Sequence, residues 1–557
     1  MKQFFCWVLI IFVGFLAAPA TAAARLSHGI VATVDPLATE AGLNVLKNGG
    51  NAIDATVAVA FTLGVVDGEN SGIGGGCFML VRRANGELVA IDGRETAPGA
   101  ATHDMFVRNG AARTELSQTG ALASGVPGAL AAYAFAVNHY GRKQLKELLL
   151  PAAEIAEKGF RVEAAYAACL KSVEPELARF ASSRKVFFRN GRLVAKGELL
   201  KQPDLALTYR KIAERGIDWF YRGTFAEATE KWMKENGGLM AAQDFRSYKV
   251  KIREPIISKY RDYELVGFPP PSSGGIHVAQ ILNILENFDL KSLEEAARLH
   301  FVAEAMKLAF ADRAYWLGDA DFVSVPRGLA DKSYAQALAK SIRTDRATEV
   351  QSHGTPPNWQ TDIFKKHTTH FSVADAEGNW VACTATVNTS FGSKVVIPGT
   401  GVIMNDQMDD FSIQPGVTNA FGLLGGEANA VAPGKRPLSS MSPTIVLKDG
   451  KPIIAMGAAG GPKIISQVVV ELMGMLDLQM SPQMALNQPR IHHQWFPNHL
   501  MVERSLSPEI QRKLRESGHV VEISSDMGVS QIVALTPTGD SFTGAADPRA
   551  GGSAKGF

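Results

Sequence analysis

One stretch of this chain, HTTHFSVADAEGNWVACTATVN at residues 367–388, decides its fold. Apolar and polar residues alternate before and after the short run Ala-Glu-Gly-Asn at 376–379. Alternation with a period of two is typical of strands, and a short run with Gly and Asn is typical of the turn between antiparallel strands. The stretch therefore predicts a β-hairpin, its second strand running from Trp380 to Val387, around which the rest of the chain is organised.

Hydroxyl side chains are crowded on the predicted hairpin. They belong to Thr368, Thr369, Ser372, Thr384, Thr386 and Thr389. Threonine is a good strand residue, so one interpretation is a half-exposed sheet face that carries hydroxyls. The other interpretation is that Thr368 is a nucleophile, which becomes an N-terminus when the chain cuts itself at the His367–Thr368 bond.

The second interpretation has a specific chemistry. A threonine hydroxyl is a weak nucleophile, and a free α-amine on the same residue can act as its general base. An α-amine has an ordinary pKa of about 7.7–8.0, so near neutral pH it can accept the hydroxyl proton. Because this amine exists only after cleavage, the Thr368 side chain would serve first in maturation and then in catalysis.

Two later blocks carry the interpretation further. They read NDQMDDFS at 405–412 and KRPLSSMSPT at 435–444. Together with residues 368–388, in this order, they closely resemble the γ-glutamyltranspeptidases, which are autoprocessed N-terminal-nucleophile hydrolases. The resemblance runs from about Leu26 to Arg549, nearly the whole chain after its leader.

The resemblance implies a fold and a domain organisation. The expected fold is of the α/β (α+β) class, a four-layer αββα sandwich. The precursor would be split into a large subunit, residues 25–367, and a small catalytic subunit, residues 368–557. The two subunits would remain together as one compact domain, a heterodimer cut from one precursor.

The resemblance also implies roles for individual residues. Thr386 would hydrogen-bond to the nucleophile, Gly460 and Gly461 would form the oxyanion hole, and Phe421 would lie in a lid at residues 415–433 whose tip carries a Tyr in bacterial relatives. The substrate's α-amino and α-carboxylate groups would be bound by Arg94, Asn388, Gln407, Asp410, Ser439 and Ser440, with Arg94 on the carboxylate and Asp410 on the ammonium. Without the resemblance, Arg94 would be a surface charge at a strand end and Thr386 a packing residue.

The segment around the two glycines departs from the family pattern. Ala458, Ala459, Pro462 and Lys463 stand where Ser, Pro, Ser and Arg are common. Proline at 462 has no amide donor, but the donors of Gly460 and Gly461 remain. We therefore expect the oxyanion hole to be retained with an altered flank.

The first 24 residues have the pattern of a secretory signal peptide. Lys2 is followed by an apolar run and then by small residues with A-x-A spacing. The alternative is a membrane anchor, but the apolar run is short of the roughly 20 residues that a transmembrane helix needs. We expect cleavage after Ala22 or Ala24 and a periplasmic or secreted protein, with no membrane attachment afterwards.

Charge and cysteine content exclude several classes of partner. The chain has 57 Lys and Arg against 55 Asp and Glu, so nothing indicates binding to nucleic acid or to an anionic membrane. Of four cysteines, Cys6 lies in the leader, while Cys77, Cys169 and Cys383 show no metal-ligand spacing. We interpret these three as buried small apolar residues, and a Cys77–Cys383 disulfide stays open.

No other motif predicts a cofactor or a metal. The glycine-rich run at 71–76 precedes its strand and lacks a Gly-Lys-Ser/Thr, so it is a weak nucleotide signature. Adjacent carboxylates at Asp409 and Asp410, without His ligands, make a poor transition-metal site. Adjacent imidazoles at His492 and His493 lack the facing geometry of zinc ligands and are interpreted as structural.

Helical periodicity is predicted between residues 120 and 340, notably at 130–140, 145–158, 207–213, 278–286 and 293–316. The polar segment 341–366 is expected to be an irregular, mobile tail ahead of the cut. The functional expectation is attack by Thr368 on a γ-glutamyl amide such as that of glutathione, followed by resolution with water or with an amino-acid or peptide amine. The alternatives are a glutaryl-cephalosporin acylase of the same fold, which Asp410 disfavours, and an uncleaved secreted glutamyl-binding protein.

Overall fold

Two antiparallel sheets form the centre of the computed structural model, which describes residues 26–360, 371–414 and 416–557. The seven-stranded sheet has the order β10 (Lys251–Arg253), β3 (Leu88–Gly93), β2 (Gly76–Arg82), β14 (Trp380–Thr386), β13 (Ser372–Asp375), β1 (Gly29–Thr33) and β22 (Ser553–Gly556). The six-stranded sheet has the order β11 (Ile256–Tyr260), β12 (Tyr263–Gly267), β15 (Thr444–Lys448), β16 (Lys451–Ala459), β20 (Val529–Leu535) and β21 (Phe542–Ala546). The predicted leader, with its cleavage point, lies outside the described residues.

The hairpin predicted from the sequence is confirmed as β13 and β14. Val373 pairs with Val381 and Ala374 with Trp380. The turn between the strands contains Gly378 with φ of 94°, a conformation that glycine adopts without steric cost. The strand β14 then pairs along its whole length with β2, so the hairpin lies at the middle of the seven-stranded sheet.

Strand alternation produces the four layers. In β1, Ile30 and Ala32 pack between the two sheets, whereas Val31 packs on the helices of the outer face. In β15, Ile445 packs between the sheets and Val446 packs on the opposite helices. Both sheets are therefore apolar on both faces, and each outer face needs a helical layer.

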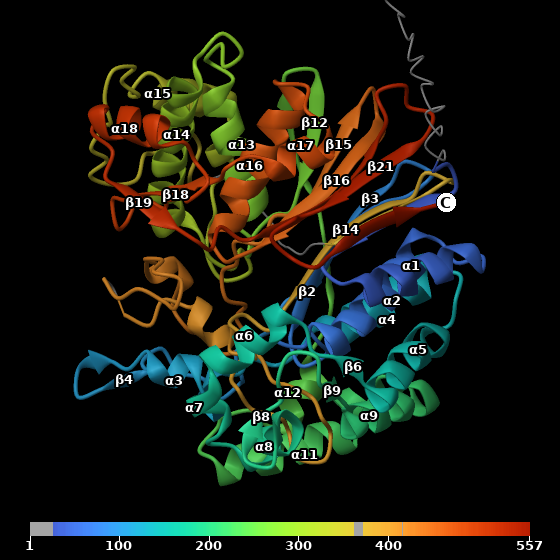
Figure 1. The fold of residues 1–557 in the computed structure, drawn as a ribbon. Coiled ribbons are helices and arrows are strands. Elements are labelled where there is room, and N and C mark those ends of the chain that lie inside the picture. The colour runs from blue at the N-terminus through green and yellow to red at the C-terminus, as the bar shows by residue number, and fades with distance from the viewer. Residues whose placement is uncertain (1–25, 361–370, 415) are drawn as a thin grey trace, which may run out of the picture.

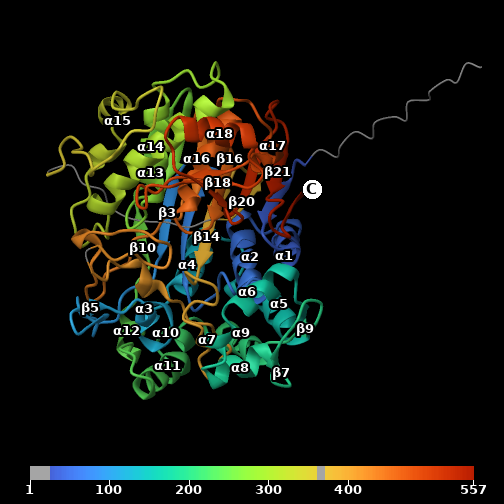
Figure 2. The same ribbon diagram turned by 60° about the vertical axis from the view of Figure 1, so that its left-hand side comes forward.

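Two sets of helices supply these outer layers (Figure 1). The seven-stranded sheet is covered by α1 (Pro36–Lys47), α2 (Ala52–Val66) and α4 (Ala129–Tyr140), and the six-stranded sheet by α13 (Gly274–Leu285), α14 (Glu295–Trp316) and α16 (Lys463–Leu476). Figure 2, turned by 60°, again shows the sheets between these two groups. The predicted αββα sandwich is confirmed.

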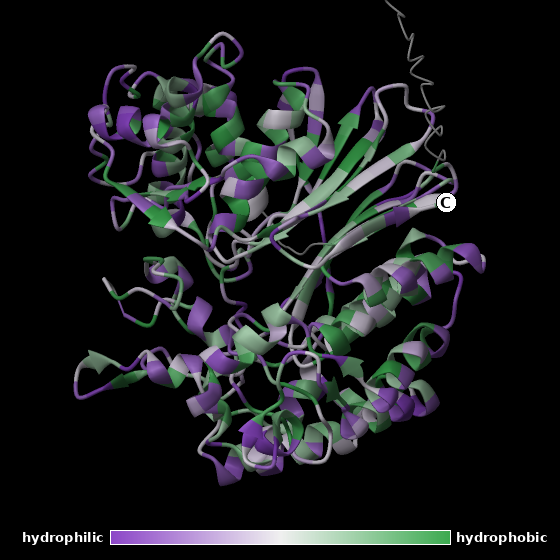
Figure 3. Ribbon diagram, viewed as in Figure 1, coloured by the Kyte–Doolittle hydropathy of each residue, from purple (hydrophilic) through white to green (hydrophobic). Residues whose placement is uncertain are grey.

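Further helices lie outside this core. The helices α5 (Leu145–Lys158) and α9 (Pro203–Arg215) pack on each other beyond α2. The remaining elements are α3 (Glu115–Gln118), α6 (Ala164–Ser172), α7 (Glu174–Leu177), α8 (Ala181–Phe187), α10 (Asp218–Tyr221), α11 (Thr224–Glu235), α12 (Ala242–Ser247), α15 (Lys332–Ala339), α17 (Pro482–Asn487), α18 (Pro508–Glu516), and the short strands β4 (Val107–Arg108), β5 (Ala111–Ala112), β6 (Phe160–Arg161), β7 (Phe188–Arg189), β8 (Arg192–Leu193), β9 (Leu199–Leu200), β17 (Ile491–His492), β18 (Leu500–Glu503) and β19 (Val521–Ser524). Figure 3 shows hydrophobic residues along α2 and α4, whereas the outer α18 is mostly hydrophilic.

The helices predicted between residues 120 and 340 are confirmed. A further helix, α2, ends at the site. Asn51 and Asp54 form a capping box at its start. Every residue of α2 is buried. The helix therefore runs through the helical layer that covers the seven-stranded sheet and ends at Val66. Its end places residues 67–70 near the ends of the central strands.

The segment before the expected cut is irregular, as predicted, but its described part is docked. Trp316 Nε1 donates to the Gly354 carbonyl (3.1 Å), and Trp495 Nε1 donates to the Val350 carbonyl (2.8 Å). Residues 341–360 therefore run along the surface with fixed contacts rather than as a loose tail. Residues 361–370, which include His367 and Thr368, lie outside the described residues.

The cysteines Cys77, Cys169 and Cys383 are all free thiols. Cys77 and Cys383 are buried in the helix-facing core, as predicted, whereas Cys169 is only half-buried because it packs against the edge of that core. Among the residues that the structure describes, no helix combines the length and the apolar character needed to cross a bilayer.

Candidate active site

A cavity of about 730 Å³ opens where β14 and β16 end. Trp380 and Ala382 of β14 pack between the sheets, so the alternation directs Thr384 and Thr386 to the same side. Both threonines line the cavity. The hydroxyl-rich end of the hairpin thus faces an enclosed space and not a solvated sheet surface.

The segment after β14 is fixed by a buried carboxylate. Asn388, at a φ of 82°, donates its amide N–H to Thr386 Oγ1 (2.8 Å) and its Nδ2 to the Asp406 carbonyl (3.1 Å). Asp406 Oδ1 also accepts the Thr389 amide (3.0 Å). Burial raises the pKa of Asp406 to about 6, against the lowering effect of Lys394 at 3.5 Å. The sequence analysis missed Asp406 as the residue that positions Asn388.

The turn at Gln407–Asp410 places a carboxylate, that of Asp410, at the cavity wall, where its charge is balanced by a buried arginine. Asp410 Oδ2 accepts from Arg94 Nη2 (2.5 Å) and from Gln407 Nε2 (2.9 Å). The Asp410 side chain is 11% exposed, while that of Arg94 is fully buried. Gln407 and Asp410 both line the cavity, as predicted for substrate-binding residues.

Arg94 lies behind Asp410 and is not part of the cavity wall. Its Nε donates to the Pro437 carbonyl (3.1 Å), and among the described residues its Nη1 has no hydrogen-bond partner. Nη1 lies 3.7 Å from Glu95 Oε2, but burial raises the pKa of Glu95 to about 8. Near neutral pH the Arg94 charge is therefore matched mainly by Asp410, and a direct grip on a substrate carboxylate stays a prediction.

Ser439 and Ser440 also line the cavity, and Arg313 contacts the second of them directly. From α14, Arg313 donates Nη2 to Ser440 Oγ (2.9 Å) and Nε to Ser273 Oγ (3.0 Å). Burial lowers the pKa of Arg313 to about 10, and Asp410 opposes that shift. The sequence analysis also missed Arg313, although a charged residue on an otherwise buried helix face was a usable signal.

Gly460 and Gly461 form a tight turn just before the N-terminus of α16. Their φ angles are 131° and 59°, in the region that favours glycine. Gln467 Nε2 donates to the Ala459 carbonyl (3.1 Å), which fixes the orientation of the peptide that carries the Gly460 amide. Amides at a helix N-terminus attract negative charge, so the turn can stabilise an oxyanion.

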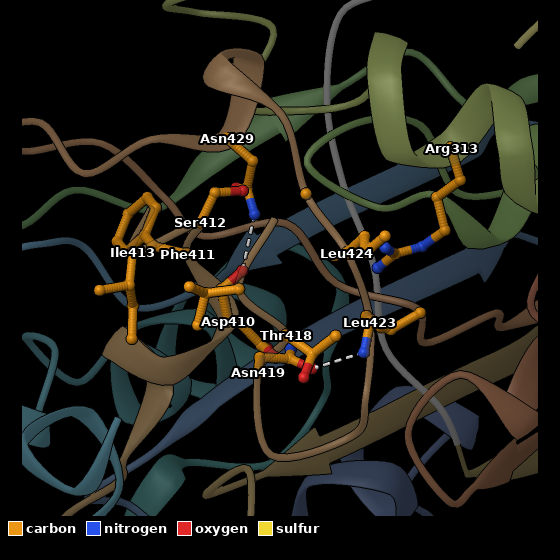
Figure 4. A pocket seen from close by; sticks show the side chains of 12 residues that line it. Arg313, Asp410, Phe411, Ser412, Ile413, Thr418, Asn419, Leu423, Leu424 and Asn429 are labelled. Atoms are coloured by element: carbon orange, nitrogen blue, oxygen red, sulfur yellow. Dashed lines mark hydrogen bonds between the residues drawn. The ribbon is translucent and has the colours of Figure 1, made fainter. Parts of the chain in front are cut away.

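The predicted lid lies over this turn. A Cβ placed on Gly461 would meet the Phe421 ring at 2.6 Å, so the ring packs directly on the glycine. Asn419 Oδ1 holds the lid by accepting the amides of Phe421 (3.0 Å) and Leu423 (3.1 Å). A second, small pocket with a volume of about 10 Å³ lies behind the lid, and Arg313 and Asp410 are in its wall. Figure 4 shows this pocket from close by.

The two adjacent carboxylates, Asp409 and Asp410, have different partners. Asp409 accepts from Ser117 Oγ (2.7 Å) and from the Ala420 amide (2.8 Å), which ties the lid to the turn. Asp410 is held by Arg94 instead. The pair is thus divided, with Asp409 bonded to the lid and Asp410 bonded to Arg94 at the cavity wall.

In the described part of the chain, one group has ligand atoms close enough for a metal: His300, Glu304 and His519. Glu304 accepts from Lys307 Nζ (2.6 Å) and from the Thr348 amide (2.8 Å). His300 Nδ1 and His519 Nε2 are hydrogen-bonded at 2.8 Å. These contacts already occupy the ligand atoms, so the cluster is a hydrogen-bonded link between α14 and the C-terminal region.

An αββα sandwich with a cavity at the ends of its central strands is the architecture of the N-terminal-nucleophile hydrolases. Comparison with known proteins gives the family. The family model described as "Gamma-glutamyltranspeptidase" matches residues 38–557. The chain belongs to this family, and it is an enzyme.

Individual relatives agree with this family. The glutathione hydrolase proenzyme of Escherichia coli (strain K12) is 45% identical over 530 residues, which cover 94% of this chain and 91% of the relative. The acylase ACY 1 proenzyme of Pseudomonas sp. (strain SE83) is 38% identical over 542 residues, which cover 95% and 93%. The crystal structure of a cephalosporin acylase from Bacillus halodurans matches with a TM-score of 0.86 and 30% identity, covering 99% of both chains.

Proposed function

We propose that this enzyme is a γ-glutamyltranspeptidase that also acts as a glutathione hydrolase. The observation that carries the proposal is the Asp410 carboxylate at the cavity wall, which accepts hydrogen bonds from Arg94 and Gln407. A γ-glutamyl group carries an α-ammonium that a carboxylate can bind. The E. coli relative, named a glutathione hydrolase proenzyme, supports the same substrate class.

The proposed reaction uses Thr368 as nucleophile and its α-amine as base. The hydroxyl oxygen attacks the γ-carbonyl carbon, and its proton passes through the α-amine to the leaving amine. The resulting γ-glutamyl ester is then resolved by water or by an acceptor amine, which restores the hydroxyl. Thr386 would hydrogen-bond to Thr368, and the amides of Gly460 and Gly461 would bind the oxyanion.

Maturation by cleavage between His367 and Thr368 is part of the proposal. The seven-stranded sheet is built from both sides of that bond, with β1, β2 and β3 before it and β13, β14 and β22 after it. Two chains that share one sheet would stay associated after the cut. The products would be residues 25–367 and 368–557, exported to the periplasm or secreted after loss of the leader.

Two relatives named as acylases favour a second candidate, an acylase that removes a glutaryl chain. A glutaryl group has no α-ammonium, so it would desolvate the Asp410 carboxylate without adding the charge-assisted hydrogen bond that an ammonium gives. The γ-glutamyl substrate therefore fits this pocket better.

The test uses two anilides that differ only in the α-amino group, γ-glutamyl and glutaryl. The purified enzyme should run as two bands on a denaturing gel and should hydrolyse the γ-glutamyl anilide faster. A single band without activity would indicate the uncleaved binding protein, and preference for the glutaryl anilide would indicate the acylase.

A further inference from the structure

Besides Asp410, further carboxylates lie in the wall of the cavity. Four of them belong to Asp35, Asp67, Glu69 and Glu163, and we call these four residues the acidic arm. Asp67 and Glu69 come directly after the end of α2. The arm therefore combines carboxylates from three separate parts of the chain.

The acidic arm is attached to the segment that carries Asn388. The Val387 amide donates to the Asn70 carbonyl (3.0 Å), and the Phe391 amide donates to the Glu69 carbonyl (2.8 Å). These two bonds bracket Asn388 along the chain. A molecule in the arm would thus lie beside the residues proposed to bind the γ-glutamyl group.

The carboxylates of Asp67 and Glu69 have no counter-charge. In the described residues no ion pair joins either of them to a Lys or an Arg, and Glu69 Oε2 is buried without a hydrogen-bond partner. The Glu69 residue is 4% exposed. Both follow the C-terminus of α2, where the helix dipole is negative and further disfavours an anion.

The pKa shifts have the direction expected for carboxylates that lack a cation. Burial raises the pKa of Asp67 to about 7, against a hydrogen bond from Asn70. Burial, and then the charge of Asp67, raise the pKa of Glu69 well above its ordinary value. A cationic ligand would relieve both effects.

The basic residues in the cavity wall are engaged elsewhere. Arg549 donates Nη2 to Glu503 (2.6 Å) and Nη1 to Asp547 (3.1 Å). Arg161 donates to the Gly197 carbonyl (2.9 Å). In addition, Tyr166, which lines the same arm, has a buried hydroxyl without a partner among the described residues. The arm therefore offers oxygen atoms to a ligand that donates several N–H groups.

We propose that the acidic arm is an acceptor subsite for amines that carry a second ammonium group, of the alkyl diamine class. This inference rests on the proposed γ-glutamyl transfer and names the acceptor that the site prefers. One end of the diamine is a neutral amine, and its nitrogen attacks the carbonyl carbon of the γ-glutamyl ester. The C–N bond forms, the bond to Thr368 Oγ breaks, and the amine proton passes through the Thr368 α-amine to that oxygen. The far ammonium stays protonated between Glu69 and Asp67.

The experiment compares 1,5-diaminopentane with pentylamine, which differ only in the second amino group. Each is supplied with the γ-glutamyl anilide to the processed enzyme at one pH above 7, where Asp67 is ionised, and the γ-glutamyl amine product is quantified by chromatography. We expect kcat/KM for the diamine to exceed that for the monoamine by about tenfold, beyond the statistical factor for its second reactive amine.

Two variants and one control locate the effect. Glu69→Gln and Asp67→Asn should each lower the diamine-to-monoamine ratio by about threefold or more, and a ratio measured on one enzyme cancels any change in its hydrolysis rate. Glu157→Gln, which removes an exposed carboxylate of α5 outside the cavity wall, should keep the wild-type ratio. If Glu69→Gln does not fold, the wild-type and Asp67→Asn measurements stand on their own.

The outcomes separate the two proposals. Equal use of both amines by the wild-type enzyme, or a ratio that survives in both variants, would overturn the acceptor subsite while leaving γ-glutamyl transfer intact. An enzyme that releases no aniline from the γ-glutamyl substrate would overturn the proposed function, and the acceptor inference with it.

Discussion

The carboxylates at the two ends of the cavity have opposite electrostatic environments. At one end Asp410 accepts hydrogen bonds from Arg94 and Gln407. At the other end Asp67 and Glu69 share no ion pair with a described basic residue. Burial disfavours the charged form of a carboxylate that has no counter-charge, and a cationic ligand relieves that penalty.

The difference implies that the ends do different work. At the Asp410 end, the carboxylate at the cavity wall is already fixed by Arg94, which lies behind it. The acidic arm instead selects ligands by their charge, because a cationic ligand removes the free-energy penalty of burying a carboxylate without a counter-charge. The predictions below test first the shared chemistry and then each end.

The largest effect is expected from Thr368→Ala. The variant should remain a single chain without activity, because nucleophile and nascent base are lost together. A denaturing gel and the γ-glutamyl anilide assay measure this. The matched control is Thr369→Ala, which removes the neighbouring hydroxyl and should still give two active subunits. Normal processing of Thr368→Ala would place the nucleophile elsewhere.

At the Asp410 end, Arg94→Lys should lower kcat/KM for the γ-glutamyl anilide by roughly 30-fold, or about 2 kcal/mol. Lysine keeps the charge but cannot reach Asp410 and the Pro437 carbonyl together. Most of the loss should appear in KM, with processing intact. Arg142→Lys, which changes an exposed arginine paired with Glu377 outside the cavity wall, is the control and should leave KM unchanged. An unaltered KM in Arg94→Lys would remove Arg94 from the pocket.

Asp410→Asn tests the specificity of the same end. The ratio of kcat/KM values for the γ-glutamyl and glutaryl anilides should shift toward glutaryl by about tenfold, or 1.4 kcal/mol. The amide loses the attraction to the α-ammonium of the γ-glutamyl substrate, whereas the glutaryl substrate has no ammonium and so no such attraction to lose. Asp409→Asn is the matched control, because Asp409 bonds to Ser117 and to the lid. An equal fall for both substrates would mean that Asp410 does not face the ammonium.

The local pattern allowed much of the fold to be predicted. Alternation in β13 and β14 and the glycine turn at 378 specify the hairpin, and helical periodicity specifies elements such as α4 and α14. The pairing of β14 with β2, almost 300 residues earlier, depends on long-range packing that no local pattern encodes. The four layers were therefore reached only through the family resemblance.

For the site, prediction from the sequence succeeded for some residues and failed for others. The motif residues Asn388, Gln407, Asp410, Ser439, Ser440, Gly460, Gly461 and Phe421 do meet at one cavity. Arg313 and Asp406 were missed because their roles arise from contacts across elements: Arg313 reaches Ser440 from α14. The acidic arm was missed for the same reason, since only the fold brings Glu163 close to Asp35 in the cavity wall. Thr368 stays a prediction, because it lies outside the described residues.

The smallest predicted effect concerns how ionisation of Asp67, in the acidic arm, changes the free energy of unfolding of the enzyme. The pKa of Asp67 is raised by burial to about 7 in the folded protein, against about 3.9 for an unfolded aspartate. Between these values the unfolded chain has lost a proton that the folded protein still holds, so the wild-type enzyme should lose stability as the pH rises from about 4 through 7.

The Asp67→Asn variant has no titratable carboxyl group at this position, so it should not show this loss of stability with rising pH. Its free energy of unfolding, measured by urea denaturation of the processed enzyme at fixed protein concentration, should gain on that of the wild type by about 1 kcal/mol or more between pH 5 and pH 8, roughly the worth of one pKa unit. The Glu157→Gln variant should follow the wild type, because its carboxylate lies on an exposed helix surface. Added 1,5-diaminopentane should narrow the gap at pH 8, since a bound ammonium compensates the ionised Asp67 of the wild type and has no such charge to meet in the variant. If the wild type and Asp67→Asn keep the same difference across this range, Asp67 is ionised in the folded enzyme without penalty, and the contrast between the two ends of the cavity does not hold.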